Sequence, residues 1–85
     1  MKVLIPSALQ SYTGQSWVAA EGATVDAVLT DLDRQFPGIR FRMIDEQGKI
    51  RRHVRLFYQR EMVFDLAQPL LADSELLIVQ ALSGG

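Results

Sequence analysis

The run Leu76-Leu77-Ile78-Val79-Gln80-Ala81-Leu82 is almost wholly apolar and is followed by Ser83-Gly84-Gly85. A short, nearly continuous apolar run of this kind predicts a strand at the centre of a sheet, with a neighbouring strand on each side. The preceding Ala72-Asp73-Ser74-Glu75 predicts a tight turn into that strand. The rest of the chain must then supply the neighbouring strands and a layer that covers one face of the sheet.

Two shorter runs near the N-terminus predict an antiparallel hairpin. Residues 1–5 alternate so that Val3 and Ile5 share one face, and residues 15–21 alternate in the same way. Residues 11–14 form a turn signal between them, and we expect Trp17 to be a core or sheet residue.

An amphipathic helix follows this hairpin. Thr24 is a suitable N-cap, and Pro37-Gly38 is a stop signal. Asp31 and Asp33 are two residues apart, so they do not face each other and predict a solvated face rather than an acid-base pair. The apolar positions between cap and stop fall at helical spacing: Val25, Val28, Leu29, Leu32 and Phe36.

The second half of the chain completes the sheet. We expect a short helical turn at residues 39–44, a strand at Arg52–Tyr58 and a short returning strand at residues 62–64. The predicted fold class is therefore α+β, a β-grasp or ubiquitin-like fold with a mixed sheet of four to five strands packed on one main helix. In it the last strand lies parallel to the first. We expect one domain over residues 1–85, with a flexible tail at residues 81–85.

Composition excludes several kinds of chemistry. The chain is 48% hydrophobic and 22% charged, as expected for a folded domain. It has no Cys and one His, His53, which gives no support to a disulfide, a metal site or a thiol nucleophile. Ser7, Ser11 and Ser16 have no His and Asp constellation near them, which gives no support to nucleophilic hydrolysis. The N-terminus has neither a signal-peptide pattern nor a membrane-length apolar run, so we expect a cytoplasmic protein.

Basic residues are concentrated in the middle of a chain whose net charge is -1. Residues 40–60 contain seven Lys and Arg against two acidic residues, whereas residues 1–39 and 61–85 are acidic. This basic segment lacks the interleaved glycines and stacking aromatics that are typical of nucleic-acid binding. We expect a solvated face, or a docking face for an acidic protein, and no nucleic-acid or membrane partner.

Four stretches share a pattern with known proteins: Val25–Leu29 through Phe36–Gly38, Val54–Tyr58, Leu71–Ile78 and Ala81–Gly85. In them the chain resembles the bacterial sulfur-carrier family of the β-grasp fold, over essentially its whole length. That family includes the small subunit of molybdopterin synthase, the thiamine-pathway carrier and the carrier of an alternative route to cysteine. Ile5–Leu9, Thr13–Gln15 and Arg52–Val54 look most like the cysteine-pathway carrier.

Three positions depart from the family pattern. The turn after the third strand usually contains Asn, and here it reads Gln59-Arg60-Glu61. The turn before the last strand often reads Asp-Gly-Asp, and here it contains Ser74 and no Gly. A Pro commonly precedes the tail, where this chain has Gln80. These departures bear on the choice of partner and pathway more than on carrier identity.

The resemblance implies a function for the C-terminal residues. A ubiquitin-activating-type enzyme would adenylate Gly85 with ATP, and a sulfur source would convert it to a thiocarboxylate. Ser83 and Gly84 would give reach without bulk. The chain would then be a carrier and not an enzyme, with no catalytic residue or bound cofactor of its own. It would be a monomer alone and form complexes with the activating enzyme and a sulfur-accepting synthase.

Docking of those partners needs a surface. We expect Arg55, Phe57, Leu77 and Val79 to lie on the sheet face turned away from the helix and, with Leu82, to dock partners. The alternative is that residues 39–50 fold over these side chains. Other functions also stay open: a ubiquitin-like modifier conjugated through Gly85, or an interaction domain with an accidental Gly-Gly. The sulfur acceptor stays open among cysteine, molybdopterin, thiamine thiazole and a secondary metabolite, as does whether Gly85 is exposed by trimming.

Overall fold

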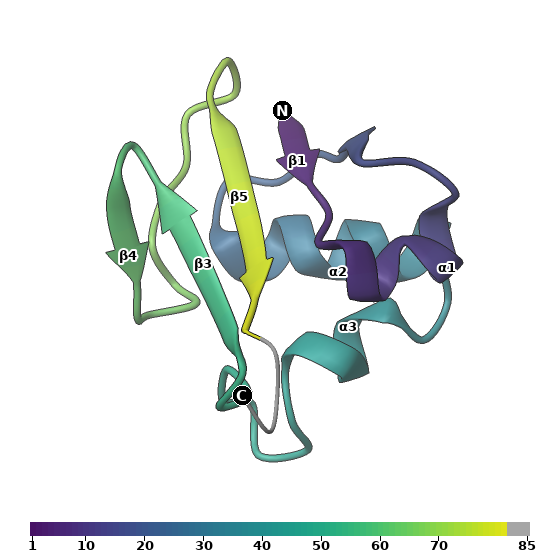
Figure 1. Cartoon of the computed structure of the whole chain (residues 1–85). Helices are drawn as coiled ribbons and strands as arrows, with labels where there is room; N and C mark the ends of the chain where they lie inside the picture. The colour runs from purple at the N-terminus through teal and green to yellow at the C-terminus, as the bar shows by residue number, and fades with distance from the viewer. Residues whose placement is uncertain (82–85) are drawn as a thin grey trace.

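The computed structural model describes residues 1–81, which form one five-stranded sheet and a layer of helices (Figure 1). The strand order is β2-β1-β5-β3-β4. The elements along the chain are β1 (Lys2–Leu4), η1 (Ser7–Leu9), α1 (Gln10–Thr13), β2 (Trp17–Ala19), α2 (Val25–Gln35), α3 (Ile39–Met43), β3 (Val54–Tyr58), β4 (Glu61–Val63) and β5 (Glu75–Gln80).

The last strand is central, which confirms the prediction from its apolar sequence. β5 pairs with β1 in parallel and with β3 in an antiparallel ladder. Leu76 and Ile78 point into the core and are 0% and 1% exposed, while Leu77 and Val79 point to the opposite face. The strand ends at Gln80, and the predicted strand residue Leu82 lies outside the described residues.

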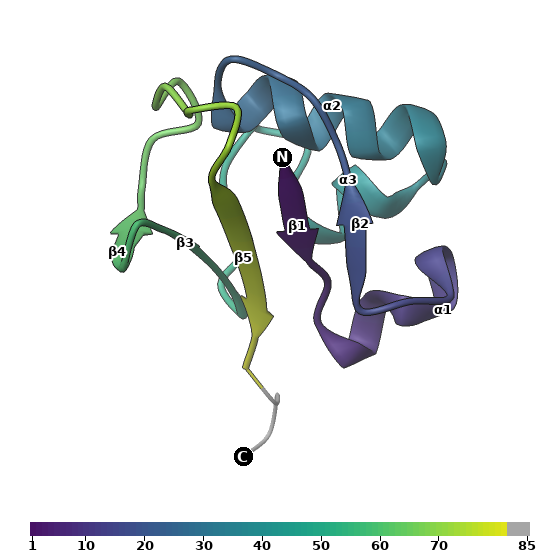
Figure 2. The ribbon, with the colours of Figure 1, turned by 90° about the horizontal axis from the view of Figure 1, so that it is seen from above.

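One helix layer covers a single face of the sheet, and α2 is its main element (Figure 2). The hydroxyl of Thr24 accepts a hydrogen bond of 3.1 Å from the amide of Ala27, which confirms the predicted N-cap. At the other end, the Asp33 carboxylate accepts hydrogen bonds from the amides of Gly38 and Arg40, both at 3.1 Å. Asp33 is therefore a structural residue that fixes the turn from α2 into α3.

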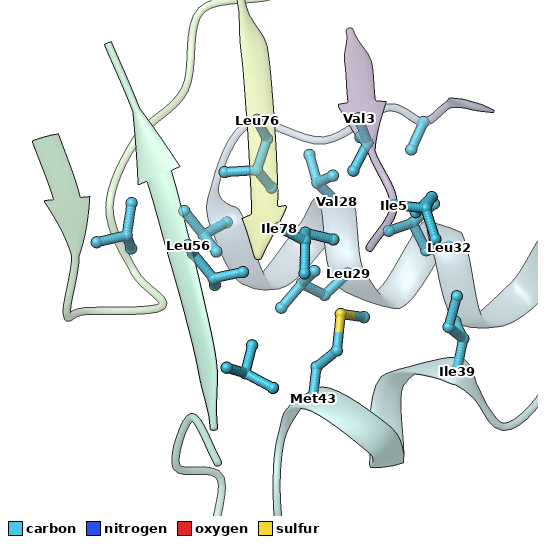
Figure 3. Packing of buried hydrophobic residues seen from close by; sticks show 14 of the residues in the cluster. Val3, Ile5, Val28, Leu29, Leu32, Ile39, Met43, Leu56, Leu76 and Ile78 are labelled. Carbon is cyan, nitrogen blue, oxygen red and sulfur yellow. The ribbon is translucent and has the colours of Figure 1, made fainter. Parts of the chain in front are cut away.

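Helix α3 completes the core rather than covering the sheet's other face. Its buried side chains pack with those of α2 and the inner face of the sheet (Figure 3). Ile39, Met43 and Ile44 are all 0% exposed. Because this segment is committed to the core, the alternative that it folds over Leu77 and Val79 is wrong for the described residues.

The N-terminal hairpin differs in part from its prediction. β1 and β2 pair antiparallel as expected, but both are shorter, and the link between them is helical. The expected turn at residues 11–14 is the end of α1, which stops at Gly14 with φ of 72°. Trp17 is a strand residue but not a core residue, since it is 42% exposed. Among the described residues, no helix is long and apolar enough to cross a membrane.

Candidate functional site

The end of β5 defines the point from which the C-terminal residues leave the fold. The amide of Ala81 donates a hydrogen bond of 2.7 Å to the carbonyl of His53, just before β3 begins. We call this point the tail root. The predicted sulfur-carrying Gly85, the tail residues Ser83 and Gly84, and Leu82 lie outside the described residues.

The turn into β5 is held by a buried tyrosine. The hydroxyl of Tyr58 accepts a hydrogen bond from the Leu71 amide at 2.8 Å and lies 3.0 Å from the Ser74 hydroxyl. The Ser74 hydroxyl donates its one hydrogen to the carbonyl of Leu71, so the Tyr58 hydroxyl donates to Ser74 Oγ. The family departure at Ser74 therefore has a structural role, because a hydroxyl here links the turn to β3.

A row of five apolar side chains crosses the face of the sheet that the helices leave open. In the strand registers, Leu4 pairs with Trp17 and Leu77, and Phe57 pairs with Leu77 and Met62. Paired residues on one face have Cβ atoms about 4.5–5.5 Å apart, so they form a continuous band. We call this band the outer-face row: Trp17, Leu4, Leu77, Phe57 and Met62, one residue from each strand.

The polarity of this open face changes along β5. At the start of β5, Glu75 pairs with Lys2, so that end of the face is charged. Near the tail root, Val79 pairs with Arg55 and is 42% exposed. The apolar part of the open face is therefore at the end from which the tail leaves.

The structure brings four of the five predicted docking residues together. Phe57 with Leu77 and Arg55 with Val79 are direct cross-strand pairs on the open face, as predicted. Leu82 stays a prediction. Sequence reasoning missed Leu4, Trp17 and Met62 as parts of the same band. The alternation of β1, β2 and β4 is a signal that marks them, once the strand registers are known.

Basic side chains border the open face. A groove of about 1040 Å³ runs beside β3 and β4, lined by residues that include Lys49, Arg52, Arg55 and Met62. Arg55 is held in place there, since its Nη1 donates to the carbonyls of Arg52 at 2.6 Å and Val54 at 3.0 Å. The basic middle segment thus lies partly beside the outer-face row.

The turn between β3 and β4 is strained. Gln59 and Arg60 have φ values of 51° and 71°, and Tyr58 pairs directly with Glu61. Two central residues with positive φ define a type I′ hairpin, which favours Asn-Gly. The family preference for Asn at this turn has a conformational reason, and this chain departs from it at a cost in backbone energy.

Two carboxyl groups have a lowered pKa, and both are structural. The Arg34 side chain, then the Glu21 amide and Gln35, lower the pKa of Asp31 by hydrogen bonding. The amide of Lys49 lowers the pKa of Asp45, with further help from Gln47 and Arg51. Residues 1–81 contain no group of three or more His, Cys, Asp or Glu arranged to hold a metal ion.

A single helix layer, a parallel pairing of the first and last strands and an open apolar face define a small β-grasp protein of the ubiquitin-like class. The ThiS family's sequence model matches residues 3–85, and the chain belongs to that family. It is 35% identical to the sulfur carrier protein CysO of Mycobacterium tuberculosis and of Mycobacterium bovis, over 98% of this chain and 96% of each relative.

Solved structures agree with this assignment. A chain of the Amycolatopsis orientalis BexX/CysO complex superposes with a TM-score of 0.89 at 31% identity, covering 99% of this chain and 98% of that one. Mycobacterium tuberculosis CysO gives 0.89 at 33% identity, covering 95% and 98%. SAMP1 from Haloferax volcanii gives 0.80 at 25% identity, covering 100% and 98%.

Proposed function

We propose that this protein is a sulfur carrier whose C-terminal Gly85 is adenylated and then converted to a thiocarboxylate. The observation that carries the proposal is the family match, which continues through residue 85 and so includes Ser83-Gly84-Gly85. The similarity to CysO proteins over nearly the whole chain favours sulfur delivery for cysteine biosynthesis. The proposal holds equally if Gly85 is the end of the chain as made or is exposed by trimming.

The chemistry requires an activated acyl group. A C-terminal carboxylate has a pKa near 3.5, so at pH 7 it is an anion and a poor electrophile. Its oxygen attacks the α-phosphate of ATP, releasing pyrophosphate and forming an acyl-adenylate. Sulfide or a persulfide donor then attacks the acyl carbon, AMP leaves, and the carbonyl bears sulfur in place of one oxygen. Where the donor is a persulfide, the first product is an acyl disulfide. A second thiol, as co-reactant, then attacks the donor's sulfur, which releases the thiocarboxylate and leaves a disulfide between the donor and that thiol.

The carrier's own part is presentation. Four residues beyond Ala81 extend about 13 to 14 Å, at about 3.3 to 3.6 Å each. That length lets Gly85 enter a partner's active site while the sheet stays outside it. Gly84 and Gly85 have no side chains to block the approach to the carbonyl. The chain then contributes no catalytic side chain, and an adenylating enzyme supplies the chemistry.

The open face is the docking surface in this proposal. Its exposed apolar band is of the kind that marks interaction sites on small proteins. Arg55 and the basic groove beside it favour an acidic partner through long-range attraction. The BexX/CysO complex shows that one structural relative binds another protein. For this chain we propose two protein partners, an adenylating enzyme and a sulfur-accepting synthase.

Blocking the C-terminal end tests this function. Gly84→Leu and Gly85→Leu should each abolish carrier-dependent exchange of pyrophosphate into ATP by the partner adenylating enzyme. Circular dichroism and the urea midpoint should stay as in the wild type, because neither residue belongs to the described core. Exchange at the wild-type rate by both variants would overturn the proposal.

A second candidate is a protein modifier joined to lysines through Gly85. Similarity to SAMP1, a small archaeal modifier protein of Haloferax volcanii, favours it. Both uses share adenylation, so the product separates them. A modifier forms adducts of higher mass with other proteins, whereas a carrier exchanges one oxygen for sulfur. This chain has only Lys2 and Lys49, which leaves few sites for conjugation to itself.

A further inference from the structure

A second cluster of side chains surrounds the tail root, on the helix side of the sheet. Phe41, Arg42, Arg51 and His53 line a hollow of about 380 Å³ together with Val54 and Gln80. We call Phe41, Arg42, Arg51 and His53 the root collar. Figure 1 shows the segment between α3 and β3 at the same end of the molecule as the end of β5. The collar is therefore beside the hydrogen bond between Ala81 and His53.

The collar and the docking face lie on opposite sides of the tail root. Along β5 the side chains alternate, so Val79 points to the open face and Gln80 to the helix side, in line with buried Ile78. Gln80 pairs with Val54, which is also buried on the helix side. A partner that touches both surfaces surrounds the point where the tail leaves the fold.

Arg51 is fixed in position before any partner binds. Its Nε donates a hydrogen bond of 2.7 Å to the Phe41 carbonyl, and its guanidinium lies 4.6 Å from the centre of the Phe41 ring. Phe41 itself is 57% exposed. The terminal nitrogens of Arg51 make no hydrogen bond within residues 1–81. A guanidinium held this way presents its remaining N–H groups as a fork that matches a carboxylate.

The charge around the collar is positive. Arg42 and Arg51 belong to the collar itself, and the acidic group whose pKa responds to Arg51 is Asp45. The Asp45 carboxylate already accepts hydrogen bonds from the amides of Gln47 and Lys49, both at 2.9 Å. Asp45 is therefore engaged in its own turn.

One acceptor in the collar hollow lacks a donor. Gln80 Oε1 is buried and has no hydrogen-bond partner among the described residues. A buried polar atom without a partner is uncommon in folded proteins. Its accessible surface is below 1 Å², so a chain docked over the hollow does not reach it. The groups that the collar offers to a partner are therefore the cationic donors of Arg42 and Arg51.

We infer that the root collar is a second docking site, which binds acidic side chains at the entrance of the adenylating partner's active site. The inference rests on the proposed function for its partner. Residues 82–85 span at most about 14 Å, so a partner that holds Gly85 at its reaction centre has its entrance beside Ala81. The fixed guanidinium of Arg51 and the net positive charge of the collar favour carboxylates on the partner around that entrance.

Charge reversal tests this in the enzymatic reaction. Arg42→Glu and Arg51→Glu should each raise the KM for the carrier in pyrophosphate exchange by about tenfold or more, with kcat nearly unchanged. The salt dependence of kcat/KM should weaken in both variants. Arg60→Glu is the matched control, because it makes the same charge change in the turn at the other end of β3. Equal KM values for all three variants and the wild type would overturn the inference while leaving the carrier function standing.

A second measurement needs no enzyme. We would titrate the ¹⁵N-labelled protein with a hexaglutamate peptide and follow the amide shifts by NMR. Shifts concentrated at residues 41–42, 51–53 and 80–81, and lost in Arg51→Glu, would support the collar. Shifts centred elsewhere, or unchanged in Arg51→Glu, would contradict it. Absence of pyrophosphate exchange by the wild type, with the peptide still bound at the collar, would instead count against the proposed function.

Discussion

The amide of Ala81 donates a hydrogen bond of 2.7 Å to the carbonyl of His53. This hydrogen bond holds Ala81, the residue after β5, beside the residue that precedes β3. The reach of the C-terminal residues is therefore measured from Ala81 and not from an earlier point in the chain. The reach beyond Ala81 can therefore be shortened by deleting a residue, and the effect on adenylation can be measured.

Deletion of Ser83 should lower adenylation without removing the Gly-Gly end. One residue fewer shortens the reach from Ala81 by about 3.3 to 3.6 Å. A displacement of about 1 Å from the reactive geometry can cost about a hundredfold in rate, so we expect at least that loss of kcat/KM in pyrophosphate exchange. Ser83→Ala keeps the length and should retain near wild-type activity. Full activity of the deletion variant would mean that tail length does not limit the reaction.

Val79→Lys should weaken docking on the open face. Val79 is exposed beside Arg55 near the tail root, and a lysine there places a second cation where we expect apolar contact. Burying that charge should raise the KM for the carrier by about tenfold or more. Ala19→Lys is the control, since Ala19 is exposed on the same face but pairs with Lys2 at the polar end. The same KM change in both variants would show that the apolar end has no special role.

Arg60→Gly should stabilise the protein. Arg60 has φ of 71°, a conformation that costs an ordinary residue about 1 kcal/mol and glycine almost nothing. We expect the free energy of unfolding to rise by about 0.5 to 1 kcal/mol in urea denaturation. Arg60→Ala removes the same side chain without relieving the strain and is the control. A gain in Arg60→Ala equal to that in Arg60→Gly would assign the effect to charge.

Asp31→Asn should reduce stability at neutral pH and lose this effect in acid. Asp31 accepts hydrogen bonds from Arg34, Gln35 and the amide of Glu21, and these lower its pKa from 3.8 in the folded state. A lowered folded pKa gives stability that is present above 3.8 and is lost as the pH falls through the folded pKa. Urea midpoints of the two proteins should therefore differ at pH 6 and converge toward pH 2. A constant difference over this range would show that the charge of Asp31 is not its source.

Much of the fold follows from sequence, because burial imposes strong patterns. The apolar run of β5, the N-cap at Thr24 and the alternation of β3 each have one good structural solution. The segment from Ser7 to Thr13 does not, since a short helix and a turn have similar local sequences. Its helices depend on packing of Leu9 into the core, which no local pattern encodes.

The candidate site was predictable in part for the same reason. Residues on β3 and β5 were placed correctly, because alternation alone assigns their faces. Trp17 and Met62 were missed, because their membership in the outer-face row depends on registers across the whole sheet. The stacking of Arg51 on Phe41 joins α3 to the following loop, and no sequence period links the two.

The central claim is that Gly85 carries sulfur, and intact-mass spectrometry tests it most directly. The wild-type protein would be incubated with its adenylating enzyme, ATP and a sulfur source, beside the Gly85→Leu variant. We predict that the mass of the wild type rises by the difference between one sulfur and one oxygen atom, and that fragmentation locates this change at the C-terminal residue. The mass of the variant should stay unchanged. A wild-type mass that stays unchanged while the enzyme is active on its own substrate, or one that shifts only through conjugation to other proteins, would contradict the claim.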